Sequence, residues 1–214
     1  MVSLQYFEEH RCGGIIYRPD LVITAAHCMY FDGVAVWRIA VPSNSSLESA
    51  SMYDVAKHRV HPNYNPATLA NDAAIWKPKS PLPNPSIKIR FAMDLQDDKM
   101  LSILGWGRTF RSASFKKSRP SISEFLLEAL VPVLPDKTCQ RIYNDIDIES
   151  QFCAGFLEGG ADGCEGDSGG PIFKDNVIYG IMSSGAGCAE RGLPGAYTRI
   201  QIAKHLIDIY SDGW

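Results

Sequence analysis

Short apolar runs separated by turn-forming residues constrain the fold of this chain more than any other feature. The runs are only a few residues long, and glycine, proline, asparagine and aspartate interrupt them at short intervals. Short strands with frequent turns are typical of all-β sandwiches and barrels. We therefore predict an all-β fold, with early strands at residues 1–7, 12–16, 21–24 and 34–41 and a hairpin turn at residues 18–20.

Three further segments depart from this pattern. Residues 78–85 contain several prolines and predict the start of a connection between two halves of the chain, 1–85 and 86–214. Residues 135–144 predict a short helix with proline in its first turn. Residues 201–210 place Ile202, Leu206 and Ile209 at helical spacing and predict a C-terminal α-helix.

Composition and charge narrow the class of protein. A chain of 214 residues that is 45% hydrophobic can bury a substantial core, and a net charge of −3 argues against electrostatic binding of nucleic acid. No apolar run reaches the length of about 18 residues that a membrane span needs. The six cysteines form no Cys-x-x-Cys pair, which disfavours a zinc ribbon or redox motif and is typical of a secreted domain with a few disulfides. The sequence alone leaves their pairing open.

A glycine-rich stretch at residues 162–171 is the strongest chemical signal. Ser168 lies there among several glycines, with acidic residues and a cysteine before it. Glycine permits backbone angles closed to other residues and lets a ligand approach the main chain. Such a turn could present a hydroxyl beside backbone N–H groups, which suits acyl transfer. The alternative interpretation is a surface turn that contains a serine by chance.

Two other stretches supply partners for that serine. His27 lies in Thr-Ala-Ala-His-Cys, and Asp72 heads an apolar run in Asn-Asp-Ala-Ala-Ile. The order histidine, aspartate, serine is the order of chymotrypsin-like triads, and it disfavours an esterase of another fold. The remaining histidines are interpreted as surface or packing residues: His10, His58, His61 and His205.

These motifs, with Gly-Trp-Gly at 105–107 and Pro-Gly-Ala-Tyr-Thr at 194–198, resemble the chymotrypsin/trypsin family of serine endopeptidases over nearly the whole chain. The resemblance implies two Greek-key antiparallel β-barrels with the active site in the cleft between them. The first barrel, residues 1–85, would carry His27 and Asp72. The second, residues 86–214, would carry Ser168 and the specificity pocket and end in a helix.

The resemblance also implies a role for each residue of the site. His27 would take the proton of Ser168 and return it to the leaving amine, while Asp72 would orient the imidazole. The backbone N–H groups of Gly166 and Ser168 would form the oxyanion hole. We therefore expect a proteolytic hydrolase, a serine protease of trypsin-like type.

Specificity is expected to depend on Asp162 at the base of the primary pocket, where an acid selects lysine or arginine. Gly185 and Gly195 match wall positions that admit a long side chain. Ser184 departs from the tryptophan usual at its position, which should weaken apolar contacts to upstream substrate residues. Glu165 should add negative charge at the cleft rim. The complete set expected to bind substrate is Asp162, Gly163, Glu165, Ser183, Ser184, Gly185 and Gly195.

Activation is the main departure from the family pattern. Mature enzymes of the family begin further upstream, with a free Ile-Val-Gly-Gly-type terminus whose ammonium group pairs with the acid at the position of Asp167. The sequence given contains no such segment. We expect Asp167 to lack this partner and the oxyanion loop to be zymogen-like, because the sequence is truncated or because the protein is latent. A non-catalytic binding protein on a protease scaffold is the alternative of another class, and truncation is the favoured interpretation.

The remaining expectations concern disulfides, modification and partners. The resemblance implies the pairs Cys12–Cys28, Cys139–Cys153 and Cys164–Cys188. Asn44 begins a glycosylation sequon, which is consistent with a secreted, extracellular protein. Residues 42–51 offer only Glu48 as a carboxylate, so we expect no calcium, no other metal and no cofactor. We expect a monomer that acts on protein or peptide substrates, with protein protease inhibitors as candidate partners and no nucleic-acid or membrane partner. The basic residues at 108–119 are interpreted as a solvated loop.

Overall fold

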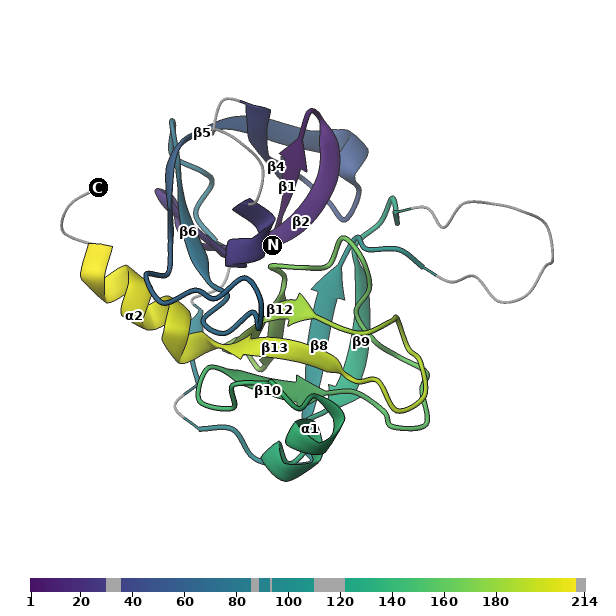
Figure 1. Ribbon diagram of the computed structural model, residues 1–214. Coiled ribbons are helices and arrows are strands. Elements are labelled where there is room, and N and C mark those ends of the chain that lie inside the picture. Colours follow the sequence, from purple (N-terminus) through teal and green to yellow (C-terminus); the bar gives the residue numbers. More distant parts are fainter. Residues whose placement is uncertain (30–35, 86–88, 93, 110–121, 211–214) are drawn as a thin grey trace.

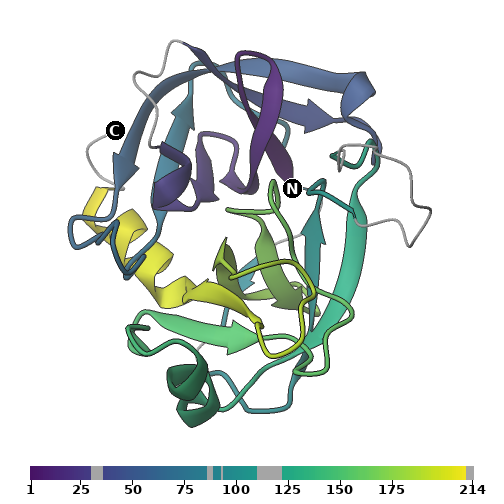
Figure 2. The same ribbon diagram turned by 45° about the vertical axis from the view of Figure 1, so that its right-hand side comes forward.

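The computed structural model describes residues 1–29, 36–85, 89–92, 94–109 and 122–210. Two β-sheets form the molecule, one above the other in Figure 1, and the chain passes through them in sequence order. The prediction of two antiparallel barrels and a C-terminal helix is confirmed, with one difference. The first sheet closes into a barrel, whereas the second is an open sheet curled into a half-barrel (Figure 2).

The first barrel contains six strands in the order β1-β2-β3-β6-β5-β4. Their bounds are β1 Val2–Tyr6, β2 Glu9–Arg18, β3 Leu21–Thr24, β4 Trp37–Pro42, β5 Ala50–Val60 and β6 Ala74–Pro78. Inward-facing apolar side chains fill the barrel. Trp37 and Trp76 are fully buried there, with ring centroids 5.1 Å apart and a T-shaped arrangement. Such edge-to-face contacts suit the quadrupoles of aromatic rings.

The second sheet has the strand order β10-β13-β12-β11-β8-β9, and β7 pairs in parallel with β12. Its strands are β7 Arg90–Phe91, β8 Met100–Gly105, β9 Leu127–Pro132, β10 Gln151–Ala154, β11 Pro171–Lys174, β12 Val177–Ser184 and β13 Gly195–Arg199. Phe152 and Tyr197 stack in its core with ring centroids 5.5 Å apart. The predicted short helix is α1, Asp136–Ile142.

The C-terminal helix α2, Ile200–Tyr210, packs against the first barrel as well as the second sheet. Its buried residues Ile200, Ala203, Leu206 and Ile207 belong to the same apolar cluster as the core of the first barrel. The buried face therefore differs from the one expected from sequence, because Ile209 is 46% exposed. No helix in the described ranges is long and apolar enough to cross a membrane.

Most sequence-based boundaries agree with the structure within a few residues. Residues 42–51, expected to be a loop, include a short 3₁₀ helix at Leu47–Ser49 and the start of β5. Part of the predicted 34–41 strand and most of the basic 108–119 loop lie outside the described residues. The division into domains at residue 85 remains a prediction.

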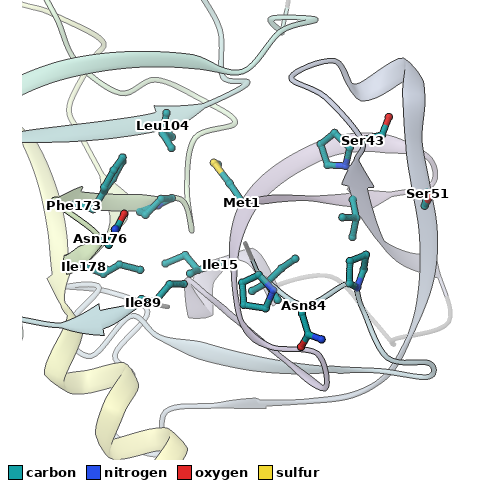
Figure 3. A pocket seen from close by; sticks show the side chains of 16 residues that line it. Met1, Ile15, Ser43, Ser51, Asn84, Ile89, Leu104, Phe173, Asn176 and Ile178 are labelled. Atoms are coloured by element: carbon teal, nitrogen blue, oxygen red, sulfur yellow. The ribbon is translucent and has the colours of Figure 1, made fainter. Parts of the chain in front are cut away.

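An apolar cavity of 550 Å³ lies where the two sheets meet (Figure 3), and neither His27 nor Ser168 lines it. Ile15 of β2 faces it from the first barrel, and Phe173 of β11 and Ile178 of β12 face it from the second sheet. Met1 extends toward the same space. Because its described lining contains no ionisable side chain, this cavity is distinct from the catalytic chemistry.

Candidate active site

His27 and Asp72 are brought together by two neighbouring strands. β3 ends at Thr24 and leads into the short 3₁₀ turn Ala26–Met29, which carries His27. β6 begins at Ala74, directly after Asp72, and Thr24 pairs with Ala74 in the antiparallel ladder. The end of one strand and the start of the other therefore lie at the same edge of the barrel. This register places an imidazole beside a carboxylate that is 45 residues away in sequence.

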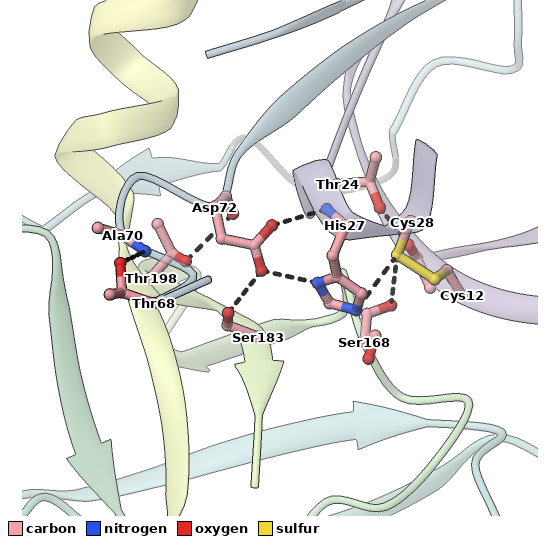
Figure 4. A network of polar contacts seen from close by, with 11 residues as sticks. Cys12, Thr24, His27, Cys28, Thr68, Ala70, Asp72, Ser168, Ser183 and Thr198 are labelled. Atoms are coloured by element: carbon pink, nitrogen blue, oxygen red, sulfur yellow. Dashed lines mark hydrogen bonds and ion pairs between the residues drawn. A yellow bond between two sulfur atoms is a disulfide. The ribbon is translucent and has the colours of Figure 1, made fainter. Parts of the chain in front are cut away.

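The Asp72 carboxylate is fully buried and hydrogen-bonded through both oxygens (Figure 4). Oδ1 accepts from the backbone N–H of His27 at 2.8 Å, and Oδ2 accepts from Nδ1 of the same residue at 2.7 Å. The Ser183 hydroxyl donates to Oδ2 at 2.5 Å. Buried charges require such bonds to offset desolvation. Because a carboxylate only accepts, Nδ1 carries the proton and neutral His27 has its Nε2 lone pair free.

Ser168 lies on the other side of His27, held by the first barrel. Its carbonyl oxygen accepts from Gly13 N–H at 2.7 Å. A sulfur of the Cys12–Cys28 disulfide is 3.9 Å from both His27 Nε2 and that carbonyl oxygen, so the two residues flank the same disulfide. No hydrogen bond joins Ser168 Oγ to His27 among the described residues. In enzymes without substrate, the distance between such a nucleophile and its base is often too long for a hydrogen bond and shortens when substrate binds.

The loop before Ser168 contains the two backbone N–H groups that were predicted to form the oxyanion hole. Gly166 has φ of +99°, which side-chain-bearing residues rarely adopt. Its carbonyl oxygen accepts from His10 Nε2 at 2.8 Å. Within the described ranges, the N–H groups of Gly166 and Ser168 donate to no protein acceptor. Both amides are therefore available to a ligand oxygen.

Two backbone N–H groups stabilise the Asp167 carboxylate. Its Oδ1 accepts from Gly107 N–H at 2.6 Å, and its Oδ2 accepts from Cys164 N–H at 2.9 Å. No cation pairs with it among the described residues. Burial raises the pKa of Asp167, and the two backbone bonds oppose that rise. A cavity of 150 Å³ adjoins this carboxylate.

A cavity of 350 Å³ joins His27 and Ser168 to Asp162. The Asp162 carboxylate accepts from Gly163 N–H at 2.8 Å and from Ala189 N–H at 3.1 Å, and burial raises its pKa. Tyr197 is fully buried at the same cavity, and its hydroxyl has no hydrogen-bond partner in the described residues. The Asp162 carboxylate is therefore the acidic group that this cavity offers among the residues given above.

The residues at the mouth of this cavity only partly follow expectation. Gly163, Glu165, Ser184, Gly185 and Gly195 line the cavity, and their role in binding substrate remains a prediction. Ser183 also lines it, but its hydroxyl is bonded to Asp72. Glu165 forms an ion pair with Arg108, whose backbone N–H also donates to the Glu165 carbonyl at 2.8 Å. The expected negative charge at the rim is therefore partly neutralised.

All three expected disulfides form: Cys12–Cys28, Cys139–Cys153 and Cys164–Cys188. Cys12, His27 and Cys28 have donor atoms within 4.8 Å of one another, but disulfide formation removes both thiolates as metal ligands. Asn44 lies on an exposed loop, where its side-chain oxygen accepts from Ser46 N–H at 2.8 Å.

Comparison with known proteins accounts for this arrangement. The family model described as Trypsin matches residues 1–207. The chain belongs to the trypsin family. It is 32% identical over 214 residues to the vitellin-degrading protease of Bombyx mori, covering 97% of this chain and 78% of the relative. It is 36% identical to cationic trypsin-3 of Rattus norvegicus, covering 89% and 76% of the two chains. A trypsin of Saccharopolyspora erythraea is also 36% identical, with 88% and 82% covered.

As a member of the trypsin family, the protein is a serine endopeptidase. Several residues at its site were not assigned a role from sequence: His10, Arg108, Tyr197 and Thr198. The Thr198 hydroxyl donates to the Asp72 carbonyl oxygen at 3.1 Å and ties β13 to the segment that carries the acid. Of these four, only Tyr197 and Thr198 lie in a motif quoted for the family, at 194–198. Nothing local to His10 or Arg108 indicates a role.

Proposed function

We propose that this trypsin-family protein is a secreted endopeptidase that hydrolyses peptide bonds after lysine or arginine. The observation that carries the proposal is the Asp162 carboxylate, which has no cationic partner among the described residues and opens into the cavity shared by His27 and Ser168. An unpaired buried carboxylate favours a cationic guest. A guanidinium group can bind both of its oxygens at once, and an ammonium group can bind one.

In the proposed reaction, His27 Nε2 accepts the Ser168 proton as Oγ attacks the scissile carbonyl carbon. Asp72 holds the imidazole in the required tautomer and stabilises the imidazolium ion. The N–H groups of Gly166 and Ser168 would stabilise the oxyanion, each worth about 10²–10³ in rate. His27 then gives its proton to the leaving amine. Water next attacks the acyl group on Ser168 while His27 accepts a proton from it, and His27 returns that proton to Ser168 Oγ as the acid product leaves.

Three disulfides and the Asn44 sequon support secretion, since disulfides persist in oxidising compartments. Cleavage after basic residues is tested with matched peptides that differ only in lysine, arginine or phenylalanine before the scissile bond. We expect rapid cleavage of the basic peptides, none of the phenylalanyl peptide, and none by Ser168→Ala. Equal rates on all three peptides would reject the specificity, and activity in Ser168→Ala would reject the triad.

A latent form is the second candidate, favoured by the absence of a cation near Asp167 among the described residues. We propose that Asp167 accepts an ammonium group in its 150 Å³ cavity when the enzyme is active. The test is to add free Ile-Val dipeptide and to compare wild type with Asp167→Asn. A dipeptide-dependent rise in turnover, absent from the variant, supports latency, whereas full turnover without dipeptide contradicts it.

A further inference from the structure

Two histidines far from the catalytic serine form a pair between a loop and the C-terminal helix. His61 follows β5, and His205 lies on α2, 144 residues later. His61 Nε2 is 3.2 Å from His205 Nδ1, and the ring centroids are 5.4 Å apart. His61 is only 3% exposed, whereas His205 is exposed on the helix surface.

The loop that His61 begins also carries Asp72. The His61 N–H donates to the carbonyl oxygen of Ala73, the residue after Asp72, at 2.9 Å. The Asn71 side-chain amide donates to the Asn63 carbonyl oxygen at 3.3 Å, so the two ends of the loop are tied together. The histidine pair therefore links the segment bearing the catalytic acid to α2.

The hydrogen bonds around the pair determine where its protons lie. Asn63 N–H donates to His61 Nδ1 at 3.3 Å, so Nδ1 carries no proton. Neutral His61 must then carry its proton on Nε2 and donate it to His205 Nδ1. His205 in turn is neutral with its proton on Nε2. This arrangement forms two consecutive hydrogen bonds, and both rings are uncharged.

One added proton breaks this arrangement wherever it binds. A proton on His61 Nδ1 faces the Asn63 N–H, which is a donor opposite a donor. A proton on His205 Nδ1 faces the His61 Nε2–H. If His61 changes tautomer to accept from His205, its proton moves to Nδ1 and faces Asn63 again. Every singly protonated form thus loses one of the two bonds.

We propose that His61 and His205 are positioning residues that hold the Asp72 segment against α2 only while both rings are neutral. Protonation of the pair loosens this segment and lowers the rate of peptide hydrolysis. Neither histidine touches substrate or the reacting atoms, so the pair acts through Asp72 and, by the His27–Asp72 bonds, on the catalytic base.

The charged surroundings are consistent with this mechanism. Burial and the charge of His205 both lower the pKa of His61. A base with a lowered pKa in the folded state stabilises the fold fully above its unfolded pKa of about 6.5, and this contribution is lost as pH falls through the folded pKa. The elements packed against the pair carry other titratable groups as well. These are Lys204, Asp208 and Tyr210 of α2, Tyr53, Asp54, Lys57, His58 and Arg59 of β5, Tyr64 and Asp72 of the loop, Lys77 of β6, Arg90 of β7, Tyr179 of β12, and Tyr197 and Arg199 of β13.

Several of those groups already have partners of their own. Lys204 pairs with Asp208 at 2.5 Å, and the Arg59 guanidinium lies over the Tyr210 ring. His58 is the one that could mimic the effect, because burial and Arg59 lower its pKa as well. A variant that changes only His205 separates the two sources.

The test compares His205→Asn, His205→Lys and the control Asp208→Asn with wild type. Asparagine keeps an acceptor near the place of Nδ1 but does not titrate, whereas lysine can only donate and imitates the protonated ring. Asp208→Asn makes the same change in net charge as His205→Lys, on the same helix, and leaves both histidines in place. The rate constant kcat/KM on a cleavable peptide is measured between about pH 5.5 and 8. The ratio of variant to wild type at each pH compares proteins that differ only at the substituted position.

The loss of one hydrogen bond predicts effects of about three- to tenfold. His205→Asn should equal wild type at pH 8 and exceed it by that factor at pH 5.5. His205→Lys should be slower by that factor at pH 8 and approach wild type at pH 5.5. A ratio that stays flat with pH for His205→Asn overturns the proposal, and so does an Asp208→Asn profile that follows His205→Lys.

Hydrogen exchange gives a readout that does not depend on cleavage specificity. The protection factors of the His61, Tyr64 and Asn71 amides should fall in wild type below about pH 6.5 and fall less in His205→Asn, where only His61 of the pair can still take up a proton. Parallel loss in both proteins would assign the effect to another group and overturn the proposal. If His205→Lys fails to fold, the comparison of His205→Asn with wild type decides by itself.

Discussion

His10 Nε2 donates a hydrogen bond of 2.8 Å to the carbonyl oxygen of Gly166, which lies 156 residues later in the chain. The contact joins β2 of the first barrel to the oxyanion loop of the second half. Ser3 Oγ lies 2.7 Å from His10 Nδ1 and donates to it, which leaves the His10 proton on Nε2. Burial lowers the pKa of His10, which favours the neutral ring, and the bond to the Gly166 carbonyl opposes that shift.

Replacing His10 should therefore impair turnover more than binding. In His10→Phe, the Gly166 carbonyl loses its donor and the loop gains freedom, and we expect kcat to fall by about tenfold, less than the loss of an oxyanion donor itself. KM should change little, because the Asp162 cavity is not touched. Steady-state kinetics measure both values, and Ser3→Ala serves as the milder control. A large rise in KM with unchanged kcat would contradict this role.

Ser183 should matter for catalysis through Asp72. Its hydroxyl donates to the buried carboxylate at 2.5 Å, and bonds to buried charges contribute about 1.5–3 kcal/mol. Ser183→Ala should lower both the free energy of unfolding, by about that amount, and kcat. Denaturant titration and kinetics measure the two effects. Ser184→Ala, one residue away and without a bond to Asp72 in the described structure, should leave stability nearly unchanged.

Binding of a basic ligand should release protons at acid pH. Burial raises the pKa of Asp162, so the empty site holds a proton over a wider acid range, whereas a bound cation favours the charged carboxylate. A small amidinium such as benzamidine should expel protons at acid pH, where the empty site is partly protonated, and none at alkaline pH. Binding calorimetry in buffers of different ionisation enthalpy measures the number of protons released per ligand bound. Proton uptake, or release that persists in Asp162→Ser, would be inconsistent with this assignment.

Gly107 should tolerate no side chain. A Cβ atom there would lie 2.4 Å from the Asp167 carboxyl carbon, so Gly107→Ala must displace the carboxylate that accepts its N–H. We expect activity to fall by more than about 10²-fold, as when an oxyanion donor is lost. Gly192→Ala is the control, since its φ of +80° is strained but no atom lies within 4 Å of the added Cβ. Similar activity in the two variants would show that steric displacement of Asp167 is unimportant.

Arg108 should tune the leaving-group side of the cleft. Its ion pair with Glu165 is exposed and adds at most about 1 kcal/mol to stability. Arg108→Ala should expose the Glu165 charge and increase the preference for lysine over glutamate immediately after the scissile bond. Competition between two peptides that differ only in lysine or glutamate at that position measures the ratio of their kcat/KM values. An unchanged ratio would mean that Glu165 does not face that part of the substrate.

The motifs were predictable from sequence because each is local. The turn with Ser168, the strand leading to His27 and the run after Asp72 each contain their own glycines, cysteines or apolar alternation. Helix α2 was predicted for the same reason, but its buried face was not. Ile209 fits a helical period and is nonetheless exposed, because the position of the first barrel against α2 decides which side is covered.

The sequence by itself determined the fold class, the chain order of His27, Asp72 and Ser168 and the acid at Asp162. Only the tertiary structure decided that His10 bonds Gly166, that Ser183 donates to Asp72 and that Arg108 neutralises Glu165. These contacts join residues between 57 and 156 positions apart. Neither propensity nor local spacing records which side chains meet when two sheets pack, because that depends on the register and packing of the whole molecule.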